Sequence, residues 1–346
     1  MNMQTNFREI SDPAVMSVQP LVSVCMLAYK HERFIAEAIE GVVSQVCDFP
    51  FELIIAEDCS PDGTLNIALD YQKRYPHVIR VLTGSRNVGM HANAARFDVT
   101  MRGKYLAGCE GDDFWTHPRK LQMQVDLMSA DPGMAACHTD HNRQKRFRTT
   151  YYKHRRDGYS AGWLEHGTTY RDLLRHWVIV MATTMFRKDI YLGFRNSEYN
   201  NPDWPFGDYG LLLYSSLHGG VGYIDEATAT YRKVGGSSTN ANYEARLNMI
   251  VATLACVDFF VARHPIPEEE ARAIRGQLKK RIYRSAFYAD DKQLMCACHA
   301  WLKENAFPRN EWMHQVRVVL IDWKAPMRMY KALKNFVSRY LHMIPS

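Results

Sequence analysis

The sequence predicts an α/β fold in which helices cover both faces of a mostly parallel β-sheet. Through the first half of the chain, apolar runs rich in β-forming residues alternate with stretches of helical spacing. Acidic residues directly follow two of the apolar runs. The chain has 346 residues, 47% of them hydrophobic, which is enough for one large domain with an appendage or for two domains.

The elements of the first half follow in a regular order. We predict strands over 21–29, 51–56, 78–83 and 104–108. Helices are predicted between them, over 34–45, 65–75 and 93–101. Thr64 ends a Pro-Asp-Gly-Thr turn, where it is placed to cap the second helix. Because ligands of open α/β sheets bind at the carboxyl ends of the strands, we expect a site at that edge.

The second half is less regular. We expect irregular structure over 140–167, apolar segments over 170–190 and 211–217, an aromatic loop over 196–208, a strand over 221–224 and helices from 240 onward. The sequence contains no internal repeat and no low-complexity linker. The predicted organisation is an N-terminal tail over 1–19, an α/β domain over 20–240 and a helical extension over 241–346.

Composition disfavours several classes of protein. Charged residues make up 23% of the chain, so disorder is not expected, and a net charge of +6 is too small to indicate nucleic-acid binding. Several of the eight cysteines lie in apolar runs, as small core residues do. Residues 1–19 lack a signal-peptide core, and no stretch approaches the roughly 18–20 apolar residues of a spanning helix. The expected compartment is the reducing cytoplasm.

Asp112 and Asp113 follow the predicted strand over 104–108. Clustered carboxylates at a strand end suit a hard divalent cation such as Mg²⁺ or Mn²⁺, which prefers oxygen ligands. A cation there would bridge a diphosphate and neutralise a departing nucleotide. A solvated acidic turn would show the same local pattern, so both interpretations stay open.

Two other acidic positions each allow a functional and a purely structural interpretation. Asp58 would accept hydrogen bonds from a base or ribose, although the turn containing Asp62 and Thr64 needs no ligand to cap a helix. Asp208 lies beside glycines and aromatic residues, where it would act as a general base or as a helix N-cap.

Two further segments contain residue types that can bind a ligand. The basic strand and glycine loop over 231–237 would hold phosphate through side chains and amides, or form an ordinary exposed turn. Cys296, Cys298 and His299 have no second Cys/His pair at suitable spacing, so we expect no zinc. The absence of the dinucleotide-binding glycine pattern disfavours an oxidoreductase.

Taken in order, these segments resemble the family 2 glycosyltransferases of the GT-A fold. The resemblance covers residues 20–240, and the shared order and spacing of the segments make it specific. The matching pieces are PLVSVCMLAYKHERFIAEAIEGVVSQ, FELIIAEDCSPDGT, NVG, GKYLAGCEGDDFWTHPRKLQ, GDYGLLLYSSLHGGVGYIDEATATYR and GGSS. The fold implied is a Rossmann-like, mostly parallel sheet flanked by helices.

The resemblance implies a role for each candidate residue. Tyr29 would stack on or flank the nucleotide base, and Asp58 would hold the base or ribose. Asp112 and Asp113 match the DXD-type motif that binds Mn²⁺ or Mg²⁺ on the donor diphosphate, with Asp113 as the first choice for direct ligation. Asp208 matches the acid that deprotonates the acceptor hydroxyl.

Four other residues complete the implied donor site. Glu110 would contact the donor sugar or the metal shell, and Asn87 and Trp115 would lie near the donor pocket. Many relatives carry a histidine where Val234 stands here. A diphosphate contact from that loop would then fall to Arg232 or to the lysine that follows it.

The expected activity is inverting transfer of a sugar from a nucleoside-diphosphate sugar to a hydroxyl of a saccharide or lipid-linked saccharide. The family resemblance favours UDP as the nucleotide of the donor, with GDP and dTDP as alternatives. The implied context is bacterial surface polysaccharide or lipopolysaccharide synthesis. A sugar-nucleotidyltransferase is disfavoured because residues 21–33 contain no glycine. The alternative is a weakly active or inactive GT-A scaffold or carbohydrate-binding protein.

The C-terminal segment 316–341 lies outside the resemblance. Its basic residues are interleaved with apolar and aromatic ones, and Asp322 is its only acid. Such a segment can lie on an anionic membrane surface, pack on the catalytic domain or form a homodimer contact. Peripheral membrane contact at the inner face of the cytoplasmic membrane is therefore one expectation among three.

Overall fold

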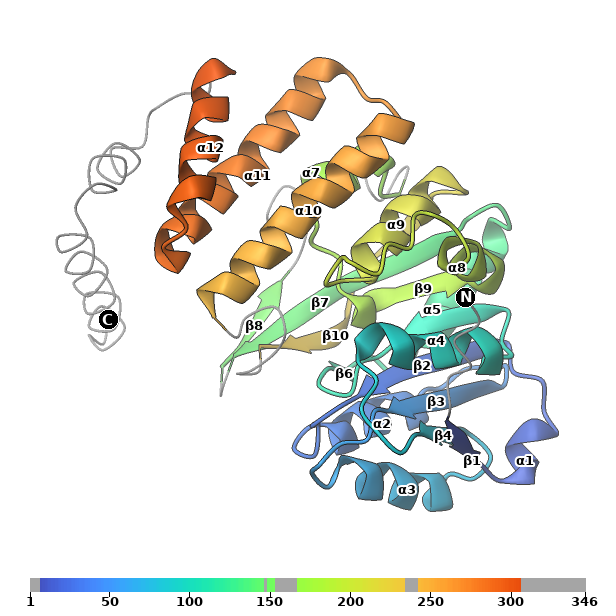
Figure 1. Cartoon of the computed structure of the whole chain (residues 1–346). Helices are drawn as coiled ribbons and strands as arrows, with labels where there is room; N and C mark the ends of the chain where they lie inside the picture. The colour runs from blue at the N-terminus through green and yellow to red at the C-terminus, as the bar shows by residue number, and fades with distance from the viewer. Residues whose placement is uncertain (1–6, 146–147, 153–166, 234–241, 306–346) are drawn as a thin grey trace, which may run out of the picture. The chain divides into compact units, whose positions relative to one another are not determined.

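A computed structural model describes residues 7–145, 148–152, 167–233 and 242–305. The chain divides into two compact units, Met1–Val234 and Gly235–Ser346 (Figure 1). Val234 and the basic segment over 316–341 lie outside the described residues.

The described residues of the first unit form a ten-stranded sheet in the order β1-β4-β3-β2-β5-β9-β7-β10-β6, with β8 paired to β7. The strands are β1 Arg8–Ile10, β2 Val22–Ala28, β3 Phe51–Glu57, β4 Ile79–Thr83, β5 Tyr105–Gly108, β6 Phe114–Trp115, β7 Ala136–Lys145, β8 Arg148–Tyr152, β9 Thr184–Arg187 and β10 Val221–Arg232. Neighbours β4, β3, β2 and β5 pair in parallel, as do β7 and β10. Because β9 is antiparallel to both β5 and β7, all six of these strands point to the same edge.

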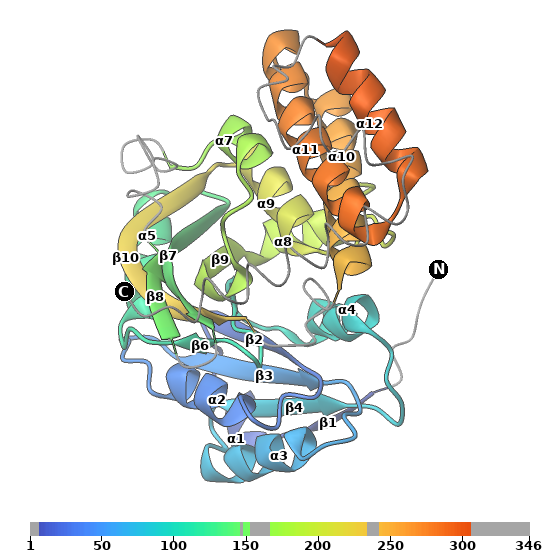
Figure 2. The same ribbon diagram turned by 90° about the vertical axis from the view of Figure 1, so that its left-hand side faces the viewer.

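Helices cover both faces of this sheet, as predicted. They are α1 Pro13–Met16, α2 Ile35–Val43, α3 Thr64–Arg74, α4 Met90–Thr100, α5 Lys120–Ala130, α7 Tyr170–Arg175, the 3₁₀ turn η1 Met181–Thr183, α8 Lys188–Arg195 and α9 Asp208–Leu217. Figures 1 and 2 show α2 and α3 on one face of β2, β3 and β4, and α4 on the other.

The main core lies under α2, α3 and α5. Ile39 of α2, Tyr71 of α3 and Val125 of α5 belong to one cluster with Val24 of β2 and Leu53 of β3. Full burial of an aliphatic side chain such as Ile39 stabilises the fold by about 1.5–3 kcal/mol. This packing fixes the strand ends from which the candidate residues project.

Predicted and observed strands agree closely in the first half of the chain. Each end of β2, β3, β4 and β5 lies within one residue of the predicted boundary. Helix α4 begins three residues earlier than expected, directly after Gly89, whose φ of 83° is a conformation that glycine adopts readily.

The predictions for two polar regions were wrong. Residues 1–19, expected to form a tail, contain β1, which pairs with β4, and Glu9 accepts a 2.7 Å hydrogen bond from Arg80. The region from 140 onward, expected to be irregular, continues β7 and forms β8. His138 and Asp140 are polar but fully buried inside the sheet, so no apolar alternation marks the strand.

Strand β10 is also much longer than the predicted strand over 221–224. It reaches Arg232 because it pairs with β7 along most of its length and with β6 near its end. Its final residues therefore lie beside the loop that follows β5, which brings a segment distant in sequence to the predicted site.

The second unit contains α10 Tyr243–Arg263, α11 Glu268–Ala289 and α12 Lys292–Glu304. Leu247, Phe287 and Met295, one from each helix, share a core cluster. By length and composition α10 could also cross a membrane, with a mean hydropathy of 1.6 over its most apolar window, so the expectation that no stretch reaches this length was wrong. Core helices of soluble proteins pass the same test, and 33% of that window is buried.

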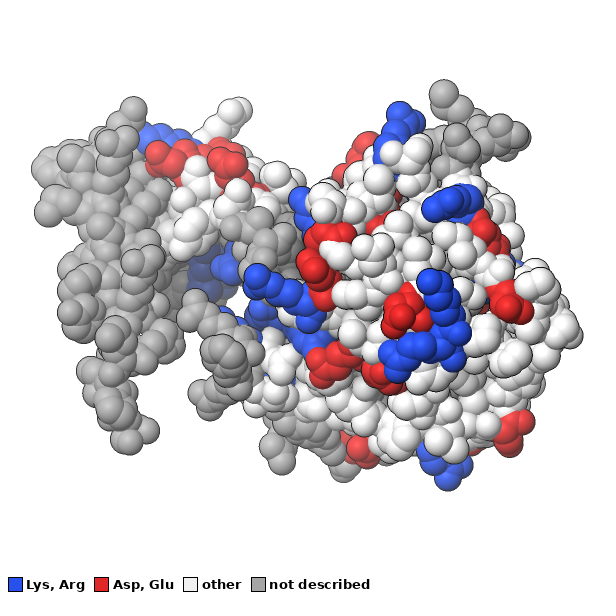
Figure 3. All heavy atoms as spheres, turned by 90° about the horizontal axis from the view of Figure 1, so that it is seen from below, with Lys and Arg blue, Asp and Glu red and all other residues white. Residues whose placement is uncertain are grey.

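Charges of both signs are interspersed on the surface shown in Figure 3. Among the described residues, Arg74 has one guanidinium nitrogen 3.7 Å from Glu40 and another 3.9 Å from Asp70. That face of the described residues therefore carries no extended field of a single sign, in keeping with the small net charge.

Candidate active site

Four acidic side chains gather where β5 and its neighbours end. Glu110, Asp112 and Asp113 lie in the loop between β5 and β6, and Asp208 begins α9. Their charges act on one another, because Asp112 raises the pKa of both other loop carboxyls and Asp208 contributes to the raised pKa of Glu110. Carboxylates from two distant segments thus meet at the edge where the sequence predicts a site.

Asp113 is the most buried of the four, with 1% of its surface exposed. Its Oδ1 accepts a 2.8 Å hydrogen bond from the backbone N–H of Arg232, whereas Oδ2 is buried and has no partner among the described residues. Burial and the charges of Asp112 and Glu110 raise the pKa of Asp113 well above its ordinary value. One oxygen is therefore fixed and the other keeps no hydrogen-bond partner among the described residues.

Asp208 is the acidic residue with which α9 begins. Its Oδ1 accepts a 2.9 Å hydrogen bond from the backbone N–H of Tyr209, and burial raises its pKa to about 6. The N-cap of α9 is Gly207, so the N-cap alternative for Asp208 was wrong. A carboxylate with a pKa near 6 is ionised near neutral pH and still basic enough to take a proton.

The chemistry of this cluster fits a divalent cation. Burial raises the pKa of Glu110, to about 8, together with the charges of Asp112 and Asp208, and a cation would relieve this repulsion. The unpartnered Oδ2 of Asp113 supplies a hard oxygen ligand. No group of three His, Cys, Asp or Glu side chains in the described part of the chain converges as ligands. The chain itself would thus supply Asp112 and Asp113, and the donor the remaining oxygens.

Asp58 is engaged by the protein backbone. Its two carboxylate oxygens accept hydrogen bonds from the N–H groups of Val88 and Gly89, both at 2.9 Å. The side chain of Asn87 donates to the Asp58 carbonyl at 3.2 Å, and Arg96 lies 3.9 Å from the carboxylate. Asp58 therefore holds the loop after β4 against the end of β3, and contact with a base or ribose stays a prediction.

Exposed side chains border Asp58 on both sides. Tyr29, directly after β2, is 38% exposed, and the Lys30 ammonium lies 5.0 Å from its ring centre. Val88 and Met90, on the loop that Asp58 holds, are 36% and 42% exposed. The Asp58 N–H donates to the Ala28 carbonyl at 3.0 Å, which joins the end of β3 to the end of β2. Tyr29 after β2 and Val88 on the loop held by Asp58 therefore flank Asp58 at the sheet edge. This apolar, aromatic border suits the flat face of a base.

Trp115 lies in the core, with 4% of its surface exposed. Its indole N–H donates to the Ala182 carbonyl at 2.9 Å, and the ammonium of the buried Lys120 lies 4.4 Å from the ring centre. The buried Trp115 is therefore engaged within the protein, and a direct contact with the donor stays a prediction. Its ring instead supports the strand that follows Asp113.

Arg232 reaches the same loop from the end of β10. Its guanidinium donates to Gln144 Oε1 at 3.0 Å and to the Asp112 carbonyl at 3.2 Å, and it forms an ion pair with Glu37. Only 7% of Arg232 is exposed. A diphosphate contact from this side chain stays a prediction, since the side chain is already well partnered within the protein.

Sequence reasoning missed His31, which lies against the acidic loop. A Cβ atom at Gly111 would lie 2.7 Å from His31 Nδ1, so the backbone approaches the imidazole closely. That nitrogen is buried without a partner among the described residues, and burial lowers the His31 pKa although Asp112 and Asp62 oppose the shift. The only sequence signal was its position directly after the first strand.

The structure adds Trp177 to the aromatic residues that the sequence places beside Asp208. Trp177 stacks on Tyr209 with ring centres 4.8 Å apart and meets Phe206 edge-on at 4.8 Å. Phe206, Tyr209 and the nearby Trp204 are buried, whereas Trp177 keeps part of its surface exposed. His91 at the start of α4 bonds to the Trp204 carbonyl at 2.9 Å, which anchors the loop before Asp208.

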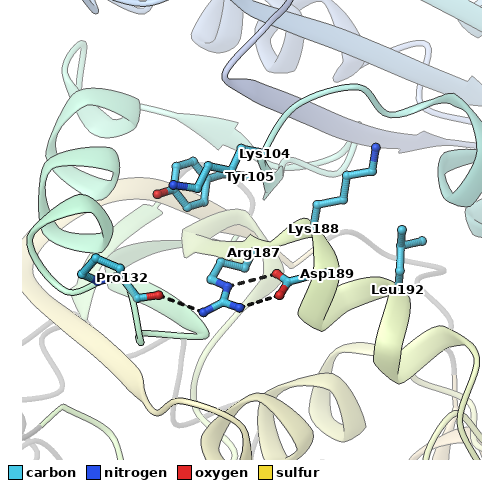
Figure 4. A pocket seen from close by; sticks show the side chains of 7 residues that line it. All are labelled: Lys104, Tyr105, Pro132, Arg187, Lys188, Asp189 and Leu192. Carbon is cyan, nitrogen blue, oxygen red and sulfur yellow. Dashed lines mark hydrogen bonds and ion pairs between the residues drawn. The ribbon is translucent and has the colours of Figure 1, made fainter.

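A shallow depression of about 510 Å³ lies at the opposite end of β5, near Lys104 and Tyr105 (Figure 4). Arg187 there is paired with Asp189 and the Pro132 carbonyl. Lys188, which also lines the depression, donates to the Met101 carbonyl. Since β5 runs away from this depression toward Glu110, it is not part of the acidic site.

A mostly parallel sheet, with helices on both faces and carboxylates at its carboxyl edge, is consistent with the GT-A class of fold. The model of the family described as Glycosyl transferase family 2 matches residues 23–191, a segment that contains Tyr29, Asp58, Asp112 and Asp113. Over this segment the chain matches glycosyltransferase family 2. The predicted fold class and family are thereby confirmed.

Relatives match the chain over part of its length. An uncharacterised protein of Mycobacterium tuberculosis is 41% identical over 116 residues, 34% of this chain and 34% of that protein. Chondroitin synthase from Escherichia coli is 27% identical over 133 residues, 38% of this chain and 19% of the synthase. The chain thus spans about a third or less of the length of these relatives.

The mannosyltransferase PcManGT from Pyrobaculum calidifontis, solved in complex with GDP-Man and Mn²⁺, has a similar fold. The TM-score is 0.57 at 15% sequence identity, and the alignment covers 94% of this chain and 86% of the mannosyltransferase. At this identity the likeness shows the fold alone.

Proposed function

We propose that the protein is an inverting glycosyltransferase that moves a sugar from a nucleoside-diphosphate sugar to an acceptor hydroxyl. One observation carries the proposal most directly. Asp208, with a pKa raised to about 6, acts electrostatically on Glu110, two residues before the Asp112–Asp113 pair. A group able to take a proton thus lies across from a carboxylate cluster suited to a cation-bound diphosphate.

In the proposed reaction Asp208 accepts the proton of the acceptor hydroxyl as its oxygen attacks the anomeric carbon. The new C–O bond forms on one face while the bond to the diphosphate oxygen breaks on the other, so the anomeric configuration inverts. The nucleoside diphosphate leaves with the electron pair of the broken bond. The surroundings of Asp208 favour this step, because burial raises its pKa to about 6 and so makes it a stronger base than an exposed aspartate.

Asp112 and Asp113 would hold Mn²⁺ or Mg²⁺, which supplies positive charge against the departing diphosphate when bound. Asp113 offers its free Oδ2, and the partly exposed Glu110 is close enough to act on the metal shell or the donor sugar. The Mn²⁺ bound to the similarly folded mannosyltransferase supports this assignment by analogy of fold.

On the nucleotide side, Tyr29 would flank the base and Asp58 would act mainly by holding the loop that carries Asn87. Exposure of Tyr29 and of Val88 on that loop supports a base-binding role. UDP is the favoured nucleotide from family resemblance. The GDP-Man complex of PcManGT keeps GDP open, because one fold accommodates different bases.

The acceptor is proposed to be a saccharide or lipid-linked saccharide in surface polysaccharide synthesis. The match to a chondroitin synthase supports a polysaccharide context. Trp177, the partly exposed ring of the cluster around Asp208, would face the acceptor, since aromatic faces pack well on sugar rings.

The alternative is a GT-A scaffold that binds donor or carbohydrate without transfer. Incubation of the purified protein with UDP-, GDP- and dTDP-sugars and Mn²⁺ separates the two, with release of nucleoside diphosphate as the readout. The proposal predicts release that Asp208→Asn abolishes while donor binding persists. Binding without release in a screen that includes saccharide acceptors would favour the scaffold.

A further inference from the structure

We propose that Arg232 and Glu37 form a tether that holds the Asp112–Asp113 turn in a geometry able to take a divalent cation. The inference rests on the proposed function, because it presupposes that the turn binds a cation. It makes Arg232 a positioning residue, in place of the donor ligand suggested by its sequence position. Glu37, on α2, has no sequence signal of its own.

Arg232 contacts both residues of the turn. Its backbone N–H donates to Asp113 Oδ1 at 2.8 Å, and its guanidinium donates to the Asp112 carbonyl at 3.2 Å. These bonds fix one oxygen of Asp113 and the backbone before it. The other carboxylate oxygen, Oδ2, keeps no protein partner among the described residues. The tether therefore positions Asp113 without forming a hydrogen bond to Oδ2, the proposed ligand atom.

The guanidinium is itself held from several directions. Its carbon lies 4.1 Å from the centre of the Phe114 ring and 5.4 Å from that of Phe34, and its Nε donates to Gln144. Glu37 completes the set by an ion pair with the guanidinium. A planar cation packed on rings and bonded at its edge has little freedom to turn.

The turn needs such restraint because its acidic groups repel one another. Glu110, Asp112 and Asp113 place three carboxyl groups within four residues of one loop, and like charges this close repel one another. Without a fixed backbone the turn can relax by moving its carboxylates apart. Groups that orient metal ligands in this way typically change metal affinity about 10- to 100-fold when removed.

Glu37 also keeps Arg232 from acting as the counter-ion of the turn. While Glu37 neutralises the guanidinium, the Asp113 carboxylate stays available to an external cation. Removing the charge of Glu37 leaves Asp113, which accepts from the Arg232 backbone N–H, as the acid in contact with that residue, so the arginine would compete with the cation. The Glu37 side chain is 57% exposed, so a glutamine amide at this position stays in reach of water.

The test compares Glu37→Gln with Glu40→Gln in the full-length protein. Glu40 lies on the same helix but contacts Tyr71 and Arg74, away from the acidic turn. Mn²⁺ binding is measured by electron paramagnetic resonance of free Mn²⁺, alone and with UDP, GDP or dTDP. We expect affinity about tenfold weaker in Glu37→Gln and unchanged within about twofold in Glu40→Gln. Nucleotide affinity at saturating Mn²⁺ should be unchanged in both.

Each other outcome is decisive. Equal Mn²⁺ affinity in the two variants would overturn the tether, and so would normal Mn²⁺ affinity in Arg232→Lys, which keeps the charge but loses the planar fork. Normal Mn²⁺ affinity with weakened nucleotide binding would make Arg232 a donor ligand. If the unmodified protein binds no Mn²⁺ with or without these nucleotides, the proposed metal site fails and the tether with it, a result visible before any variant is compared.

Discussion

Asp208 combines the properties that a general base requires. It begins a helix, it is largely removed from water, and burial raises its pKa to about 6. Asp208→Asn should lower kcat about 10²- to 10⁴-fold with little change in donor affinity, because a base acts in the transition state. Turnover and donor binding are measured separately, and near-normal turnover of the variant would remove Asp208 from the mechanism.

The same pKa sets the acid limb of the pH profile. A base must be ionised to accept a proton, so activity is retained above the pKa of Asp208 and lost as the pH falls through it. We expect kcat/KM to fall about tenfold per pH unit below a pH of about 6. A profile flat down to pH 4.5, with the protein still folded, would contradict this assignment.

At this scale the sequence indicated where several acids lie but not what they touch. Asp112, Asp113 and Asp208 were recognisable from their motif neighbourhoods. The sequence does not predict the hydrogen bonds of Asp58 to two backbone N–H groups or the ion pair of Arg232 with Glu37. Those partners come from segments 30 and 195 residues away. Motif spacing identifies a residue, whereas its partners depend on tertiary packing.

At the scale of elements, Asp58 links β3 to the loop that precedes α4. Asp58→Ala removes the acceptor of the Val88 and Gly89 N–H groups and should lower the free energy of unfolding by about 1–3 kcal/mol. Denaturant unfolding and nucleotide titration together check this. Full stability with weakened nucleotide binding would instead make Asp58 a direct ligand, as the family resemblance implies.

Lys120 at the start of α5 gives a second test at this scale. Burial lowers its pKa to about 7 from an ordinary 10.5. Between these pH values the unfolded chain binds one more proton than the folded chain, so stability contributed through this residue should rise with pH by up to about 1.4 kcal/mol per unit. Lys120→Met should remove that slope. The comparison is made by denaturant unfolding at pH 7 and pH 9, and identical slopes would show that Lys120 is not buried as described.

The sequence predicted the elements of the first half well because their residues follow simple periods. The strands β2 to β5 are apolar runs and α2 has a clear apolar face. Strand β7 was missed because His138 and Asp140 are polar residues, which the sequence pattern places at the surface, whereas neighbouring strands bury them. Strand β10 was cut short for the same reason, since pairing with β7 extends it.

At the scale of the whole molecule, the basic segment over 316–341 and the apolar α10 raise the question of membrane contact. We predict that the full-length protein pellets with vesicles containing anionic lipid and that high salt releases it, since surface charge attraction is screened. A protein lacking 316–346 provides the comparison. Pelleting that is insensitive to salt and to this truncation would point to α10 instead.

The central claim is that the acidic edge of the sheet binds a nucleoside diphosphate through a divalent cation. Calorimetric titration of the protein with UDP, GDP and dTDP, each with Mn²⁺ and with EDTA, tests it most directly. We predict that one nucleotide, with UDP favoured, binds with Mn²⁺ and that EDTA or Asp113→Ala weakens this binding at least tenfold. Absence of binding by all three nucleotides to folded protein, or binding indifferent to EDTA and to Asp113→Ala, would contradict the account.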